Sequence, residues 1–149
     1  MEVKIFTPPK FDQSPLDLNN LAKLTFKQWL YASNGRASIY HILKDLRINK
    51  ILVPVYICHT VLIPLKKINI TPIFFDIEIE DLNPSIKSIK ELSIIHDVST
   101  VLVSSIYGNP ANLIDIEKYC SEMGMFMIDD AAQSFGARLN GRYVGTFGN

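Results

Sequence analysis

The stretch that decides the fold is MFMIDDAAQSFGARLNGRYVGTFGN, residues 125–149. It begins with four consecutive apolar residues, Met125 to Ile128, which run directly into two aspartates, Asp129 and Asp130. Consecutive apolar residues are typical of a strand that is covered on both faces, as in a parallel sheet. Because successive strand residues point to opposite sides, the two carboxylates should not share one task. We expect one to face a ligand and the other to hydrogen-bond structure, since a buried carboxylate needs a cation or several donors to remain ionised.

Three more apolar runs of the same kind precede it, at residues 51–55, 72–76 and 100–105. Helical patterns lie between the runs, and the clearest place apolar residues at i, i+3, i+4 and i+7 within residues 36–46 and 112–124. Shorter helices are expected at residues 83–92 and 58–68. This alternation predicts an α/β fold with a mostly parallel sheet flanked by helices.

Several local signals fix the ends of these elements. Asn112 is a candidate N-cap with Asp115 as its capping-box partner, and Gly124 is the expected stop of the same helix. Pro64 should kink its helix or fall in the first turn. Asn140-Gly141 predicts a type I′ turn and therefore a terminal hairpin.

The composition of the chain argues against several classes of protein. The chain has 149 residues, enough for one domain, and its 15 basic and 15 acidic residues balance, so nothing indicates a nucleic-acid partner. No apolar stretch approaches a membrane span of about 20 residues, and the N-terminus lacks the apolar core of a secretory signal. A cytoplasmic protein is expected. Cys58 and Cys120 have no zinc-ligand spacing, and we expect both to be reduced and buried, with no metal site.

Ligands of open α/β sheets bind beyond the carboxyl ends of the strands. Asp76, Ser104 and the Asp129-Asp130 pair fall at such ends, although polar residues commonly end a strand for structural reasons alone. Gly35 lies just before a helix, where backbone N–H groups and the positive dipole end can bind phosphate. Ordinary helix capping explains such a sequence equally well.

Several motifs in order resemble one known family. IDDAAQSFGARLNGRYVGTFG is similar to the signature of the DegT/DnrJ/StrS-type sugar aminotransferases, which are pyridoxal-phosphate enzymes of the aspartate aminotransferase-like class, fold type I. SNGRAS resembles the family's phosphate turn, and ILVPVYICHTV, PIFFDIEIEDLN and YGNPANLIDIEKYCSEMG resemble further segments. The resemblance covers most of the chain and implies the fold, the cofactor pyridoxal 5′-phosphate, and a nucleotide-sugar substrate with an amino-acid donor in a homodimer.

The resemblance also assigns residues. Asp130 corresponds to the aspartate that keeps the pyridine nitrogen protonated, and Gln133 to a residue that hydrogen-bonds near the ring hydroxyl. Gly35, Arg36 and Ala37 match the phosphate turn. Asp129 stands where glutamate is usual and is expected to be structural.

One position departs from the family. Cys58 replaces an aromatic residue that stacks on the ring in many members, and Tyr56 is a candidate substitute, although a packed strand-end aromatic is at least as good an explanation. In the family, GTFGD leads to a lysine that forms the Schiff base, whereas this sequence ends at GTFGN. Residues 1–149 are therefore expected to be the N-terminal part of a large domain, without catalytic lysine or small domain, and inactive alone.

Three interpretations of the function remain open, and two others are disfavoured. The first is a transaminase that converts a nucleotide-linked keto-sugar to an amino-sugar with glutamate as donor. The second is a sugar dehydratase of the same family, in which histidine replaces the lysine, and the third is a non-catalytic binding or interaction remnant. A phosphorylation receiver domain is disfavoured because the aspartate pair follows the last parallel strand. A dinucleotide-binding domain is disfavoured because no GxGxxG follows a strand.

Overall fold

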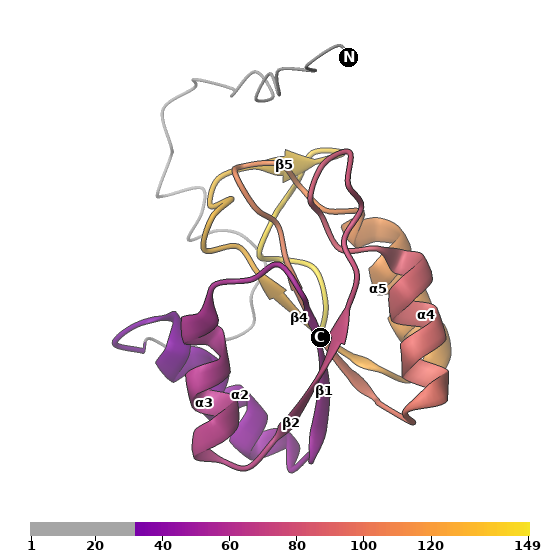
Figure 1. Ribbon diagram of the computed structural model, residues 1–149. Helices are drawn as coiled ribbons and strands as arrows, with labels where there is room; N and C mark the ends of the chain where they lie inside the picture. The colour runs from indigo at the N-terminus through magenta and orange to yellow at the C-terminus, as the bar shows by residue number, and fades with distance from the viewer. Residues whose placement is uncertain (1–31) are drawn as a thin grey trace, which may run out of the picture.

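The computed structural model describes residues 32–149 (Figure 1). Its centre is a parallel sheet of four strands in the order β2-β1-β3-β4. The strands are β1 (Lys50–Pro54), β2 (Thr71–Phe75), β3 (Thr100–Ser104) and β4 (Phe126–Asp130). Each expected apolar run is a strand, with ends within two residues of the predicted ones. The parallel α/β architecture is confirmed.

One expectation about the sheet is wrong. All four strands were expected to be covered on both faces, but β2 is only partly covered, and Phe74 is 46% exposed while Phe75 is buried. The reason is position: β2 lies at the edge of the sheet, with a strand neighbour on one side only among the described residues. β3 lies inside the sheet and is buried along its whole length.

Two helices cover each face of the sheet. Figure 1 shows α2 (Gly35–Leu46) and α3 (Leu62–Lys67) on one side and α4 (Ile86–Ile95) and α5 (Leu113–Met123) on the other. Successive residues of β1 point to opposite faces of the sheet. Leu52 packs on the face covered by α4 and α5, whereas Ile51 and Val53 pack on the face covered by α2 and α3. No helix in residues 32–149 is long and apolar enough to cross a membrane.

Local chemistry explains where the helices begin and end. The side chain of Asn34 accepts a hydrogen bond from Ala37 N–H and caps α2, and Ser85 caps α4 in the same way. Gly124 ends α5 in the left-handed conformation with φ 64°, as predicted. Pro64 lies in the first turn of α3, behind the short 3₁₀ helix η1 (His59–Val61).

The predicted side-chain cap of α5 is wrong. Asn112 stands at the N-cap position, but its side chain makes no capping bond to the helix backbone. Its φ and ψ of −71° and 59° differ from the extended conformation that directs a side-chain oxygen at the first turn. The Asn112 amide instead donates to the Asp115 carboxylate at 2.8 Å.

The C-terminal part returns to the sheet. β5 (Arg138–Leu139) and β6 (Arg142–Tyr143) form the predicted hairpin, with φ of 50° at Asn140 and 83° at Gly141, as a type I′ turn requires. The chain then runs back along the outer edge of β4, where Asn149 N–H donates to the Met127 carbonyl at 3.3 Å. The Asn149 side-chain oxygen accepts from Met127 N–H at 3.0 Å.

The two cysteines differ. Both are free thiols, and Cys120 is buried as expected. The expectation that Cys58 is buried is wrong, because it follows the carboxyl end of β1 in the exposed loop that leads to η1.

Candidate functional site

A cavity of about 500 Å³ lies beyond the carboxyl end of β4. Its walls come from the first turns of α2, the end of β4, the following loop, and the segment after the hairpin. The volume lies within the range of small-molecule sites. Much of the lining is apolar and includes Ile39, Ile42, Ile128 and Val144. The cavity therefore combines an apolar lining with the carboxylates of Asp129 and Asp130.

Asp130 is the charged group at the end of β4 that lines this cavity. It is half-buried, and one carboxylate oxygen accepts from Ala132 N–H at 3.0 Å. Among the described residues, none donates a hydrogen bond to the other oxygen. That oxygen is available to a ligand that carries an N–H or O–H donor.

The start of α2 contributes another part of the cavity lining. Gly35 lines it, and a Cβ at Gly35 would meet no atom within 4 Å, so the space beside this backbone is open. Ala37 N–H is already bonded to the backbone oxygen and to the side-chain oxygen of Asn34, both at 3.0 Å. The N–H groups of Gly35 and Arg36 have no acceptor among the described residues. They remain for an anion at the positive end of the helix dipole.

The structure brings two of the six predicted cofactor residues into one cavity. Gly35 and Asp130 both line it, although they come from opposite ends of the described chain. Arg36 and Ala37 follow Gly35 on α2 but are not among the lining residues. Gln133 is exposed outside the cavity, and its carbonyl accepts from Gly108 N–H at 2.9 Å.

Tyr56 also lies outside the cavity. It is 45% exposed after β1, and its hydroxyl is 2.6 Å from the hydroxyl of Tyr107, which follows β3. This hydrogen bond raises the pKa of Tyr107. The two phenols therefore join the loops at the carboxyl ends of neighbouring strands without reaching the cavity.

Cys58, which stands where many family members have a ring-stacking aromatic residue, is exposed and is not among the residues that line the cavity. Its thiol lies 3.1 Å from the Thr60 hydroxyl, and this hydrogen bond lowers the pKa of Cys58. The charges of Arg36 and Asp130 also act on the thiol, the first lowering its pKa and the second raising it. The pKa of the Cys58 thiol therefore depends on the charges of both Arg36 and Asp130.

Asp129, the other member of the pair, accepts hydrogen bonds from the protein backbone, which is the structural role that was expected. One of its oxygens, Oδ2, accepts from Gly145 N–H at 2.6 Å and from Phe147 N–H at 3.2 Å. The other oxygen is buried without a partner among the described residues. Burial raises the pKa of Asp129 to about 6, against the lowering effect of the two backbone hydrogen bonds.

Two parts of the cavity were missed. Ser38, Ile39 and Ile42 line it because they share with Gly35 one face of α2, and that helical spacing was a usable signal. The wall made by residues 143–146 had no comparable signal, since it depends on the hydrogen bonds that Asp129 accepts rather than on a local pattern.

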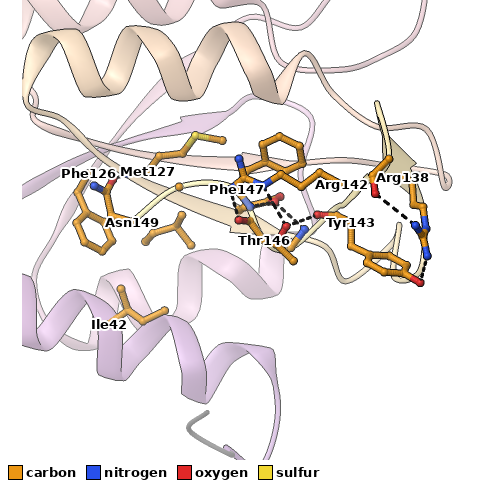
Figure 2. Close-up of a pocket in the computed structure, with 14 residues that line it drawn as sticks. Ile42, Phe126, Met127, Arg138, Arg142, Tyr143, Thr146, Phe147 and Asn149 are labelled. Carbon is orange, nitrogen blue, oxygen red and sulfur yellow. Dashed lines mark hydrogen bonds between the residues drawn. The ribbon is translucent and has the colours of Figure 1, made fainter. Parts of the chain in front are cut away.

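A second cavity, of about 830 Å³, lies on the outer edge of β4. Figure 2 shows Ile42 of α2 on one side of it and Arg142, Tyr143 and Phe147 across from it. Asp129 lines both cavities. Within residues 32–149, no group of three or more His, Cys, Asp or Glu side chains is arranged to hold a metal ion.

Comparison with known proteins identifies the family. The sequence model of the DegT/DnrJ/EryC1/StrS aminotransferase family matches residues 22–149. The chain belongs to this family. GDP-perosamine synthase of Vibrio cholerae is 28% identical over 129 residues, which cover 85% of this chain and 35% of that protein. GDP-4-keto-6-deoxy-D-mannose 3-dehydratase of Escherichia coli O55:H7 is 32% identical over 100 residues, which cover 67% of this chain and 26% of that protein.

Solved structures of relatives confirm the fold. A crystal structure of GDP-4-keto-6-deoxymannose-3-dehydratase with a trapped PLP-glutamate geminal diamine matches with a TM-score of 0.65 and 30% identity, over 74% of this chain and 30% of that one. 3-Amino-5-hydroxybenzoic acid synthase shares the fold with a TM-score of 0.70 and 17% identity, over 76% of this chain and 30% of that one. The fold is the fold-type-I, aspartate aminotransferase-like one, as predicted. This DegT/DnrJ/EryC1/StrS chain spans about a third of the length of these relatives.

Proposed function

We propose that this chain forms the part of a fold-type-I large domain that binds the phosphate and the ring nitrogen of pyridoxal 5′-phosphate. The observation that carries the proposal is that Gly35 and Asp130, assigned to these two ends of the cofactor, line one cavity of about 500 Å³. Two solved relatives support it, since their descriptions name bound hydrated PLP and a PLP-glutamate geminal diamine.

The donor set of the cavity fits the cofactor. The N–H groups of Gly35 and Arg36 suit a phosphate at the start of α2, with the Arg36 guanidinium as an additional cation. The Asp130 oxygen that has no described donor suits a protonated pyridine nitrogen, which would donate a charge-assisted hydrogen bond to it. When bound, the cofactor supplies an electron sink for carbanion chemistry. Asp130 contributes by holding the proton on the ring nitrogen.

In this proposal, the other residues assigned by the resemblance act from outside the cavity lining. Gln133 is exposed on the loop that follows Asp130 and would be the residue that hydrogen-bonds near the ring hydroxyl. Tyr56 belongs to the loop after β1 and offers an aromatic surface beside Cys58. Ala37 supports the phosphate turn through its bonds to Asn34 rather than by a free N–H.

For the whole protein we propose a cytoplasmic, homodimeric enzyme that acts on a nucleotide-linked keto-sugar, with an amino acid such as glutamate as amino donor. The match to two GDP-perosamine synthases supports transamination. A sugar 3-dehydratase is the second candidate, because two relatives of that name are 32% and 30% identical. No lysine lines the cavity within residues 32–149, and we propose that the Schiff-base residue is not among them.

The experiment is equilibrium dialysis of the 149-residue chain against pyridoxal 5′-phosphate, compared with Asp130→Asn and with Asp45→Asn as a surface control. Asp45 is an exposed residue of α2 outside the cavity. Loss of a charge-assisted hydrogen bond, worth about 1.5–3 kcal/mol, should weaken binding roughly tenfold or more in Asp130→Asn alone. Equal affinities of all three chains would refute the assignment of Asp130.

Borohydride reduction followed by peptide mass mapping tests the attachment. We expect no stoichiometric adduct on a lysine of residues 32–149. A single lysine in that range that is fully modified would show that this stretch supplies its own anchor, and would overturn that part of the proposal.

A further inference from the structure

We propose that Asp129 is a positioning residue: its carboxylate holds residues 145–147 against the end of β4 and thereby fixes the cavity wall that faces Asp130. That this cavity receives a pyridine cofactor rests on the proposed function above. The clamp itself rests only on contacts within the chain. Nothing in the resemblance assigned Asp129 more than a general structural part.

The clamp is made by one oxygen atom. Asp129 Oδ2 accepts from Gly145 N–H at 2.6 Å and from Phe147 N–H at 3.2 Å. These donors are two residues apart on a segment outside the regular strands, so the oxygen fixes the direction of the backbone as well as its distance from β4. Glutamine or asparagine carbonyl oxygens can accept such bonds, whereas an aliphatic side chain cannot.

The clamped segment is in direct contact with the Asp130 loop. Residues 143–146 line the same cavity as Asp130. A Cβ at Gly145 would lie 2.9 Å from the Cβ of Ala131, the residue after Asp130, and Gly145 has φ of 87°. Residues 145–147 therefore cannot move toward β4 without displacing Ala131, and if they move away Ala131 loses its contact with Gly145. Ala132 follows Ala131 and its N–H donates to Asp130, so its amide resonance should shift when these residues move.

The clamp depends on pH through a defined set of charges. Burial is the main cause that raises the pKa of Asp129 to about 6, with Asp130 raising it further and Arg142 of β6 lowering it. Tyr143 also lines the cavity, and the lining residues of α2 carry no titratable side chain. The two backbone hydrogen bonds of the clamp lower the same pKa. Release of the segment removes these bonds and changes the burial of Asp129, so its pKa changes and the opening of the clamp depends on pH near 6.

Amide hydrogen exchange by NMR on the 149-residue chain tests the proposal without any cofactor. The variants are Asp129→Ala and Asp129→Asn, with Asp45→Ala as a control on the surface of α2. In Asp129→Ala we expect at least tenfold faster exchange at Gly145 and Phe147 and a shifted Ala132 amide resonance. In Asp129→Asn the side-chain carbonyl replaces Oδ2, so protection should return while the pH dependence of opening between pH 5 and 7 disappears.

Unchanged protection at Gly145 and Phe147 in Asp129→Ala would overturn the proposal. If that variant does not fold, the asparagine variant decides, because a pH profile of opening identical to that of the unmodified chain would overturn it as well. An intact clamp in a chain that binds no pyridoxal phosphate would refute the proposed function and support this inference, so the two failures are distinguishable.

Discussion

Arg142 and Glu117 form a bidentate ion pair that joins the C-terminal hairpin to α5. The two guanidinium nitrogens lie 2.8 and 2.9 Å from the two carboxylate oxygens. The same carboxylate accepts from Gly148 N–H at 2.8 Å, and the guanidinium lies over the Phe147 ring at 4.0 Å. A single glutamate thus fastens both ends of the segment that carries the cavity wall.

Glu117→Ala should lower the free energy of unfolding by about 1–2 kcal/mol, because it removes a bidentate pair and leaves Gly148 N–H without its acceptor. Glu122→Ala on the same helix is the matched control. Its pair with Lys118 is long, 4.0 Å, and its side chains are 73% and 62% exposed, so a change below about 0.5 kcal/mol is expected. Urea unfolding measures both. Equal effects of the two variants would contradict the structural importance of the pair.

Gly145→Ala should destabilise the fold more than Gly141→Ala. Both glycines have positive φ, 87° and 83°, so both alanine variants carry a backbone cost of about 1–2 kcal/mol. Only Gly145 is also crowded, with Ala131 Cβ 2.9 Å from the added methyl group, whereas nothing lies within 4 Å at Gly141. Overpacking adds about 1–3 kcal/mol. Thermal unfolding of the two variants checks the order, and a larger loss at Gly141 would show that the crowding is absent.

The sequence predicts the sheet and its helices well because their signals are local. Consecutive apolar residues mark β1 and β3, and the 3.6-residue period marks α2 and α5. The exposure of β2 was not predictable in this way, since it depends on the order of strands and not on the strand's own residues. Asn112 was misjudged because the choice between capping and bonding to Asp115 depends on one backbone conformation.

The site was predictable only in part. The resemblance assigned Gly35 and Asp130 to the cofactor, and the fold brings them to one cavity. Chain spacing cannot show that Ala37 N–H is already bonded to Asn34, or that Cys58 is exposed. The wall from residues 143–146 depends on a contact between Asp129 and Gly145, and no local pattern records that pairing.

Cys58 should be alkylated selectively. Its thiol is exposed and its pKa is lowered by hydrogen bonding to Thr60, whereas burial raises the pKa of Cys120 to about 11. Because the thiolate is the nucleophile, iodoacetamide at pH 8 should modify Cys58 at least tenfold faster than Cys120. Thr60→Val should slow the reaction at Cys58 alone. Peptide mass mapping over time checks both statements, and comparable rates at the two cysteines in the folded chain would contradict them.

The stability of the fold should respond to the ionisation of Asp129 between about pH 4 and pH 6. Its pKa rises from 3.8 to about 6 on folding, so the folded state binds the proton more tightly. The associated stability is therefore fully present below about pH 4 and is lost as the pH rises through about 6, on the order of 2–3 kcal/mol in total.

Other carboxylates titrate in the same window, so the quantity to measure is the difference between the unmodified chain and Asp129→Asn, by urea unfolding at several pH values. Asp129→Asn should gain stability relative to the unmodified chain as the pH increases. A constant difference between the two chains would mean that Asp129 has an ordinary pKa in the fold.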